Sequence, residues 1–217
     1  MNKLPDSGFD RVSSFYDWLA TLVYGNSLQE AQLALLPFVQ EHSKVLLIGG
    51  GSGWLLEQLC RSGKKLQVLY LDAAPNMIYK AKQRFNHLPF PHQVTATFRT
   101  GTEAALLPAE RFDVIITPFL LDLFPPLRLQ QLMAKLLASL QPNGCWLFAD
   151  FWPVAPAPPF WQRLLIKSMY LFFGTLSGVQ ARALPDYRRQ FEQLCLQEVF
   201  SNSFYKGMVQ AKVYRCF

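Results

Sequence analysis

Short apolar runs alternate with amphipathic segments along most of this sequence. The apolar runs cover residues 44–48, 66–71, 94–99, 112–117 and 144–148. Segments with apolar residues at helical spacing lie between them, at 54–60, 75–85 and 127–140. Runs such as VLLI and DVIIT show no polar alternation, which is typical of strands covered on both faces. The alternation of strand and helix predicts a mostly parallel sheet with helices on both of its faces.

The N-terminal part precedes the first strand with two expected helices. Apolar positions at helical spacing predict one helix near residues 12–19 and another over residues 28–36. Ser27 and Glu30 have the spacing of a capping box, which would start the second helix.

The C-terminal part begins after residue 150 with a change of composition. The proline-rich sequence FWPVAPAPPFW predicts a loop that leaves the sheet, and an aromatic helix is expected over residues 162–173. Residues 185–194 predict another helix with Pro185 in its first turn. Two strand-like runs at 197–205 and 208–215 then predict a terminal antiparallel hairpin that closes the sheet.

The composition is that of a packed globular protein. The 217 residues are 51% hydrophobic and 17% charged, which favours a single domain. The opening sequence MNKLPDSGFDRV contains no apolar h-region and no small-residue cleavage site, so we expect a cytoplasmic location. The most apolar late stretch, residues 168–178, is shorter than the roughly 20 residues that a membrane-spanning helix needs.

Charge, cysteine and histidine positions argue against two other classes of protein. The net charge is +6, but Lys and Arg are scattered rather than gathered in one run, so no nucleic-acid partner is expected. The four cysteines form no C-x-x-C pair, and the three histidines lack the helical spacing of metal ligands. We therefore expect free thiols and no metal site.

The most informative stretch is VLLIGGGSG at residues 45–53, where a glycine cluster links the first strand to the next helix. Glycines allow a sharp turn and the close approach of a ligand, and the first turn of a helix offers unpaired N–H groups. This order of strand, glycine loop and helix is typical of a site for a nucleotide-like ligand. A tight structural turn would account for the glycine cluster equally well on its own.

Asp72 is the second feature of this candidate site. It ends the next apolar run, roughly twenty residues after the loop, so its carboxylate is expected beside the glycines at the carboxyl edge of the sheet. A carboxylate in that place can accept hydrogen bonds from both ribose hydroxyls. The alternative role is an N-cap for the helix that begins near Pro75, and the two roles are compatible.

Trp54 distinguishes between two kinds of nucleotide-like ligand. A dinucleotide fingerprint that starts at Gly49 requires glycine at position 54, so NAD is disfavoured. The spacing of Gly49, Gly51 and Gly53 resembles instead the first motif of class I S-adenosylmethionine-dependent methyltransferases of the small-molecule type.

The resemblance to this family continues along most of the chain. LDAAPNMI, which contains Asp72, resembles the second motif, FRTGTEAALLP the third and RFDVIITPFLLDLF the fourth. LQPNGCWLFADF is similar to the turn and fifth strand of the family's fold. The opening FDRVSSFYDWLATLVYG is similar to the N-terminal segment of members that act on quinones and other small molecules, where a Tyr-Asp pair lies over the cofactor. The resemblance implies an α/β, Rossmann-like fold with a seven-stranded sheet, and S-adenosyl-L-methionine as cofactor.

The resemblance also implies which residues contact the cofactor. They are Gly49, Gly50, Gly51, Gly53, Asp72, Ala73, Met77, Thr102, Glu103 and Thr117. Thr102 and Glu103 would lie beside the adenine. Two positions depart from the family's pattern: Leu47 replaces a common acidic residue that helps to hold the methionine end, and Thr102 replaces the usual aspartate.

Methyl transfer from a sulfonium depends on alignment and on exclusion of water, because the leaving group departs neutral. A base is needed only for some acceptors. Asp122 and Tyr16 are the candidate catalytic residues for accepting a proton from the acceptor or orienting it, followed by Asp150 and Tyr187. Each of these side chains is also compatible with a structural role.

We therefore predict one methyltransferase domain over residues 1–217. Its parts are an N-terminal helical lid (1–40), a cofactor-binding core (44–150), an aromatic insert (151–184) and a final helix with the hairpin (185–217). The predicted activity is methylation of a small, apolar acceptor. Two alternatives stay open: a cofactor-binding but catalytically inactive homologue, and an RNA or protein methyltransferase.

The aromatic insert carries the hypothesis of an apolar acceptor. Its many aromatic residues are expected to form a pocket above the cofactor, with packing on the sheet or a homodimer contact as alternatives. Arg163 and Lys167 in the same segment also allow peripheral contact with an anionic membrane surface. The sequence leaves open whether the chain is a monomer or a homodimer.

Overall fold

The computed structural model describes residues 25–152 and 184–215, and within them seven strands form one sheet. The order of the strands across the sheet is β3-β2-β1-β4-β5-β7-β6. Their bounds are β1 (Lys44–Ile48), β2 (Leu66–Asp72), β3 (Val94–Thr100), β4 (Phe112–Pro118), β5 (Leu140–Phe151), β6 (Gln197–Phe204) and β7 (Val209–Arg215). Strands β1 to β5 pair in parallel, and β7 is antiparallel to both β5 and β6. The predicted sheet and its terminal hairpin are confirmed.

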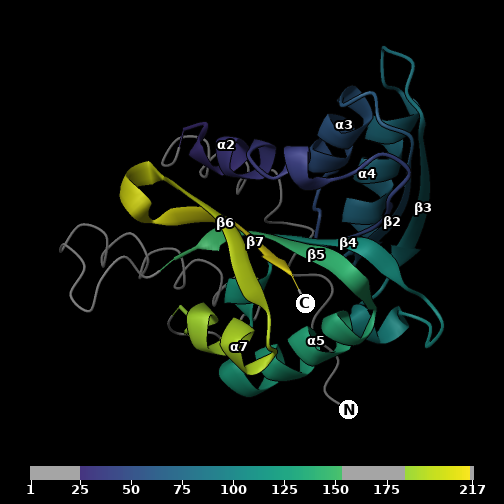
Figure 1. Cartoon of the computed structure of the whole chain (residues 1–217). Coiled ribbons are helices and arrows are strands. Elements are labelled where there is room, and N and C mark those ends of the chain that lie inside the picture. The colour runs from purple at the N-terminus through teal and green to yellow at the C-terminus, as the bar shows by residue number, and fades with distance from the viewer. Residues whose placement is uncertain (1–24, 153–183, 216–217) are drawn as a thin grey trace.

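Helices cover both faces of this sheet (Figure 1). One face carries α2 (Ser27–Leu33), α3 (Trp54–Arg61) and α4 (Pro75–Asn86), and the other carries α5 (Pro126–Ala138) and α7 (Tyr187–Gln193). In the part of the chain that the structure describes, four short 3-10 helices join the elements: η1 (Leu36–Phe38), η2 (Glu103–Ala105), η3 (Leu121–Leu123) and η4 (Tyr205–Gly207).

Each face of the sheet has its own apolar core. Leu47 of β1 is fully buried in the same cluster as Leu55 and Leu59 of α3. Its neighbour Leu46 is fully buried on the opposite face, in the cluster that contains Leu132 of α5. Because side chains of a central strand are buried on both sides, β1 consists of apolar residues after its first position. Complete burial of one leucine side chain contributes roughly 1.5–3 kcal/mol to stability.

An aromatic cluster joins α7 and the hairpin to the parallel part of the sheet. The rings of Phe191 in α7 and Tyr214 in β7 stack, with centroids 3.7 Å apart and planes 11° apart. Trp146 of β5 packs edge-on against Phe191. The indole Nε1–H of Trp146 donates to Thr117 Oγ1 at 3.0 Å, so its polar atom is satisfied inside the core.

Two predicted helix starts are wrong. The capping box of Ser27 and Glu30 does not form, because Asn26 has helical backbone angles and makes Ser27 the first helical residue, without a side-chain cap. α7 begins at Tyr187 rather than at Pro185. Asp186 caps α7 by accepting a hydrogen bond from the Arg189 N–H at 3.2 Å.

Several expectations concern residues outside the described ranges. These are the helix near residues 12–19, the helix over residues 162–173 and nearly all of the insert 151–184. The division of the chain into four parts therefore stays a prediction. In the described part of the chain, none of the helices has the length and apolar character needed to cross a membrane.

Candidate active site

The glycine loop lies between β1 and α3, at the carboxyl edge of the parallel strands. Gly51 and Gly53 have φ values of +61° and +89°, in the left-handed region that favours glycine. A Cβ atom at Gly53 would lie 2.8 Å from the Cα of Ala81 in α4, so this glycine allows α3 and α4 to pack closely. A Cβ atom at Gly51 would meet nothing within 4 Å. The backbone at Gly51 is therefore accessible to a ligand.

Asp72 contacts this loop from the end of β2. Its Oδ2 accepts a hydrogen bond from the Gly51 N–H at 3.1 Å, and its Oδ1 accepts one from the Ala74 N–H at 2.9 Å. A carboxylate offers about four acceptor positions, so capacity remains for two ribose hydroxyls. Burial raises the pKa of Asp72, and the two N–H bonds oppose this rise. The N-cap alternative is wrong, because Ala74 holds that position in α4 and no side chain caps the helix.

Tyr70 supports the loop from inside the sheet. Its fully buried hydroxyl donates to the Gly51 carbonyl oxygen at 2.7 Å. A Cβ atom at Gly50 would lie 2.6 Å from the same hydroxyl oxygen, so the ring packs directly against the loop. Burial, with a smaller effect of the Asp72 charge, raises the pKa of Tyr70 well above its usual value, so the hydroxyl stays a donor. The expected site residues did not include Tyr70. In the sequence it stands out only as a tyrosine among the aliphatic residues of β2.

Thr102 and Glu103 lie in the turn after β3, and both have partners in the protein. Thr102 Oγ1 accepts from the Ala104 N–H at 3.3 Å. The buried Glu103 carboxylate pairs with Arg128 of α5, whose Nη2 lies 2.6 Å from Oε1 and 2.7 Å from Oε2. The Arg128 guanidinium also lies over the Phe124 ring, 5.4 Å from its centroid. This ion pair fixes η2 against α5, and the contact of Thr102 and Glu103 with adenine stays a prediction.

The remaining expected cofactor residues occupy different environments. Ala73 is exposed directly after β2, and Met77 is partly exposed in the first turn of α4. Thr117 is fully buried, and its hydroxyl oxygen accepts the bond from Trp146. The structure therefore brings the loop and Asp72 together, whereas the Thr117 side chain lies in the core. Leu47, where the family commonly has an acid, is also a core residue.

Two buried carboxyl groups lie after β4 and at the end of β5. Asp122 in η3 is 2% exposed and Asp150 is fully buried. Oδ2 of Asp150 accepts from the N–H groups of Leu121 and Asp122, at 3.0 and 3.3 Å. Burial raises the pKa of Asp122 to about 7. Burial together with the Asp122 charge raises the pKa of Asp150 well above its usual value. Asp122 can therefore accept or release a proton near neutral pH. Tyr16, the other candidate catalytic residue, lies outside the described residues.

The family comparison covers the part of the chain that builds this site. Residues 45–144 match the methyltransferase domain family. The matched range begins in β1 and ends in β5, so it contains the glycine loop, Asp72 and the turn after β4. Residues 45–144 of this chain are therefore similar to a methyltransferase domain. The predicted Rossmann-like fold is confirmed. The family match supports the predicted S-adenosylmethionine-dependent class and its cofactor.

Individual relatives of this methyltransferase domain are distant in sequence. The 3-methylorcinaldehyde synthase tropA of Talaromyces stipitatus is 24% identical over 184 residues, which cover 70% of this chain and 7% of that protein. The N-methyltransferase NodS of Bradyrhizobium japonicum, solved with S-adenosylhomocysteine, has a TM-score of 0.64 at 18% identity, covering 89% of this chain and 87% of NodS. The 1,6-didemethyltoxoflavin-N1-methyltransferase of Burkholderia thailandensis has a TM-score of 0.64 at 17% identity, covering 97% of this chain and 87% of that one.

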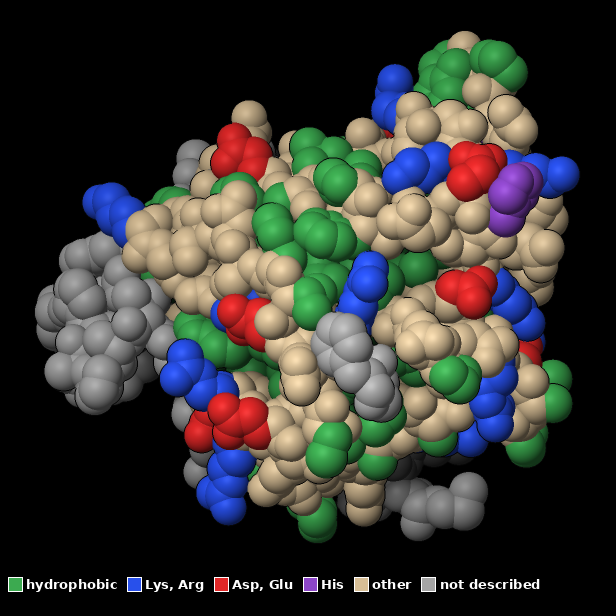
Figure 2. All heavy atoms as spheres, viewed as in Figure 1, with side chains coloured by type: hydrophobic (Ala, Val, Ile, Leu, Met, Phe, Trp, Pro, Cys, Tyr) green, Lys and Arg blue, Asp and Glu red, His purple; other side chains and the backbone are tan. Residues whose placement is uncertain are grey.

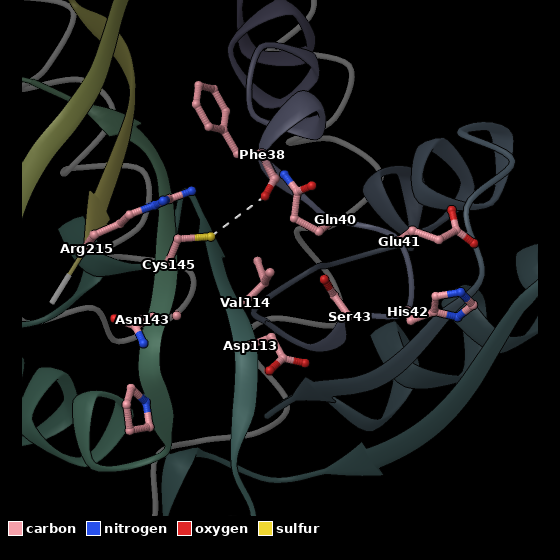
Figure 3. Close-up of a pocket in the computed structure, with 12 residues that line it drawn as sticks. Phe38, Gln40, Glu41, His42, Ser43, Asp113, Val114, Asn143, Cys145 and Arg215 are labelled. Atoms are coloured by element: carbon pink, nitrogen blue, oxygen red, sulfur yellow. Dashed lines mark hydrogen bonds between the residues drawn. The ribbon is translucent and has the colours of Figure 1, made fainter. Parts of the chain in front are cut away.

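A cavity of about 360 Å³ lies at the other edge of the sheet, near the starts of β1, β4 and β5 (Figure 3). Asp113 lines it and accepts a hydrogen bond from the Lys44 N–H at 2.8 Å. The Cys145 thiol is directed at the Phe38 carbonyl oxygen, 3.8 Å away. The glycine loop and Asp72 lie at the carboxyl edge, so this cavity is separate from the candidate active site of the methyltransferase domain.

A metal-ligating cluster and a basic patch are two other features that a further site would show. No group of three or more His, Cys, Asp and Glu side chains that could hold a metal ion occurs among them. On the face shown in Figure 2, Lys and Arg side chains are interspersed with Asp and Glu rather than gathered in one patch.

Proposed function

We propose that this methyltransferase domain uses S-adenosylmethionine to methylate a small, apolar acceptor. The observation that supports the cofactor site most directly is Asp72, whose carboxylate contacts Gly51 and keeps acceptor capacity beside the accessible backbone of the loop. The cofactor supplies an electrophilic methyl group on a sulfonium whose leaving group departs neutral.

We assign the following roles to the residues of this site. The backbone of the loop at Gly49, Gly50, Gly51 and Gly53 lies along the cofactor, and Asp72 binds its ribose hydroxyls. Ala73 and Met77 line the same side, and Thr102 and Glu103 lie near the adenine. The backbone of Thr117, at the end of β4, contacts the cofactor from the other side of β1. Asp122 accepts the proton of the acceptor where it carries one, and Tyr16 orients the acceptor.

An apolar acceptor is supported by aromatic side chains near the end of β5 and at the start of α7. Trp152 is partly exposed and stacks on Tyr187, with centroids 5.5 Å apart and planes 25° apart. Phe148 packs against Tyr187 at 4.9 Å. This aromatic group lies near the carboxyl end of β5, where ligands of open α/β sheets bind. The bound 1,6-didemethyltoxoflavin of the Burkholderia enzyme also favours a small-molecule acceptor.

The proposal is tested by measuring the release of S-adenosylhomocysteine, the product that forms when S-adenosylmethionine transfers its methyl group. The full chain is incubated with small aromatic acceptors and with polar acceptors of the same size, and we expect release with the aromatic ones. Trp152→Ala should lower this release about tenfold, because an aromatic side chain that would pack against the acceptor is lost. It should leave S-adenosylhomocysteine affinity unchanged. Phe90→Ala is the matched control, because this partly exposed ring packs against Arg61 in another part of the molecule.

Other outcomes would favour the alternatives. Binding of S-adenosylhomocysteine without turnover of any acceptor would indicate a cofactor-binding, inactive homologue. Turnover of RNA or protein alone would contradict the small acceptor. The cytoplasmic location, the peripheral membrane contact of the insert, and the choice between monomer and homodimer stay predictions from the sequence.

A further inference from the structure

The turn that follows β4 packs directly on the glycine loop. The Phe119 N–H donates to the Ala149 carbonyl oxygen of β5 at 2.7 Å, and Phe119 has a φ of +51°, which a bulky residue rarely adopts. Leu120 then lies against Gly49, where an added Cβ would be 2.9 Å from Leu120 Cδ1. A backbone in such a conformation persists only where surrounding contacts hold it.

Asp150 provides the contacts that hold this turn. Its Oδ2 accepts from the N–H groups of Leu121 and Asp122, and its Oδ1 accepts from the Phe151 N–H at 2.8 Å. The carboxyl group is fully buried, so water does not compete for these bonds. One side chain of β5 therefore ties two backbone groups of the turn to the end of the strand.

Asp122 places a second carboxyl group beside the first. It is 2% exposed, and its Oδ1 has no hydrogen-bond partner among the described residues. Burial raises the pKa of both groups, and the Asp122 charge further raises the pKa of Asp150. Burial therefore favours the protonated form of both carboxyl groups. A neutral amide at position 150 would preserve the size of the protonated carboxyl group.

We propose that Asp150 is a positioning residue for the cofactor loop. Its carboxyl group holds the turn after β4, and this turn holds Leu120 against Gly49. Asp150 acts on cofactor affinity through these contacts and does not itself touch the cofactor. Only the binding measurement that tests this inference rests on the proposed function.

The test compares two substitutions of Asp150 by two measurements. Asp150→Leu has a similar size but no acceptor, so we expect about tenfold weaker binding of S-adenosylhomocysteine by calorimetry. Amide hydrogen exchange at Gly49, measured without ligand, should become faster in the same variant. Asp150→Asn keeps one carbonyl oxygen for the N–H groups of Leu121 and Asp122 and loses only the bond from the Phe151 N–H, which lies outside the turn. Its affinity should therefore stay within about threefold of the original protein.

Asp113→Leu is the matched control. It removes a carboxylate that also accepts a backbone N–H group, that of Lys44, but at the opposite edge of the sheet. We expect it to change neither S-adenosylhomocysteine affinity nor exchange at Gly49.

Leu120→Ala tests the contact through which Asp150 acts. Because both residues hold the same loop, the variant that combines Leu120→Ala with Asp150→Leu should lose no more affinity than the weaker-binding single variant. Additive losses, or a folded Asp150→Leu with unchanged affinity and exchange, would overturn the proposal. If Asp150→Leu does not fold, unchanged exchange at Gly49 in Leu120→Ala overturns it. If the original protein fails to bind S-adenosylhomocysteine, the proposed function fails, and exchange at Gly49 still decides the role of Asp150.

Discussion

Asp72 combines a structural role with its proposed role in binding. One oxygen holds Gly51 and the other holds Ala74, so the carboxylate is already oriented before a ligand arrives. Little ordering of this side chain is then needed on binding, which favours affinity. The same arrangement means that a substitution of Asp72 affects the loop as well as the ligand, and the two effects have to be measured separately.

Asp72→Ala should weaken the binding of S-adenosylhomocysteine at least about tenfold, because a hydrogen bond to a charged group contributes about 1.5–3 kcal/mol. Calorimetry with S-adenosylhomocysteine and its 2′-deoxy analogue separates the two roles. The original protein should prefer the hydroxylated ligand, and Asp72→Ala should bind both equally. A preference that survives in the variant would show that another group binds the ribose. Urea unfolding without ligand measures the loss in the loop alone.

Asp122 gives the stability of the protein a dependence on pH. Its pKa of about 7 in the native state lies above the value of about 3.9 for an unfolded aspartate, so the native state binds more protons between these values. The contribution of Asp122 to the free energy of unfolding should therefore be highest below about pH 4. It should fall as the pH rises towards 7. Asp122→Asn cannot ionise, and urea unfolding at several pH values should show a flatter decline.

Asp113→Asn serves as the control for this pH dependence, because Asp113 is an exposed carboxylate at the opposite edge of the sheet. It should leave the decline between about pH 4 and 7 in place. An equal slope in Asp122→Asn and the original protein would mean that Asp122 ionises as easily in the folded chain as in the unfolded one.

At the scale of elements, buried strands were easier to predict than helix ends. Residues 44–48 were predicted as a strand with the bounds that β1 has, because a strand buried on both faces requires a continuous apolar run. The starts of α2 and α7 depend on single backbone angles at Asn26 and on the cap at Asp186, which apolar spacing does not report. Element type therefore follows from patterning, and element boundaries follow from local hydrogen bonds.

Three glycines associated with α3 should respond differently to alanine. Gly63→Ala, with a φ of +72° and open space around the new Cβ, should cost about 1 kcal/mol of stability from backbone strain alone. Gly51→Ala should cost a similar amount but also weaken S-adenosylhomocysteine binding. Gly53→Ala should cost about 2–4 kcal/mol, because its Cβ would also press on the Ala81 backbone.

Urea unfolding and calorimetry on the three variants distinguish these effects, with Gly63→Ala as the control for backbone strain. Equal losses of stability in Gly53→Ala and Gly63→Ala would show that α4 can move away from α3 with little loss of free energy of unfolding. Unchanged affinity in Gly51→Ala would place the ligand elsewhere.

At the scale of the whole molecule, the site is assembled from strand ends that are far apart in the sequence. The spacing between the loop and Asp72 was predictable, because parallel strands bring their carboxyl ends to one edge. The pairing of Glu103 with Arg128, 25 residues away, was not, and neither was the contact of Asp150 with Leu121, 29 residues away. These bonds depend on how η2, η3 and α5 pack, and the residue types alone do not specify that packing.

Ligand binding should therefore stabilise the whole fold and not the loop alone. At a concentration of about 100 times its dissociation constant, S-adenosylhomocysteine should add about 2.7 kcal/mol, which corresponds to a rise in Tm of about 5–10 °C for a chain of this size. NAD and NADP should produce no rise, because Trp54 stands where a dinucleotide fingerprint requires glycine. Thermal unfolding with each ligand measures this ranking, and Asp72→Ala should lose most of the rise at the same S-adenosylhomocysteine concentration. A larger rise with NAD would show that Trp54 does not exclude a pyrophosphate and that the loop binds a dinucleotide.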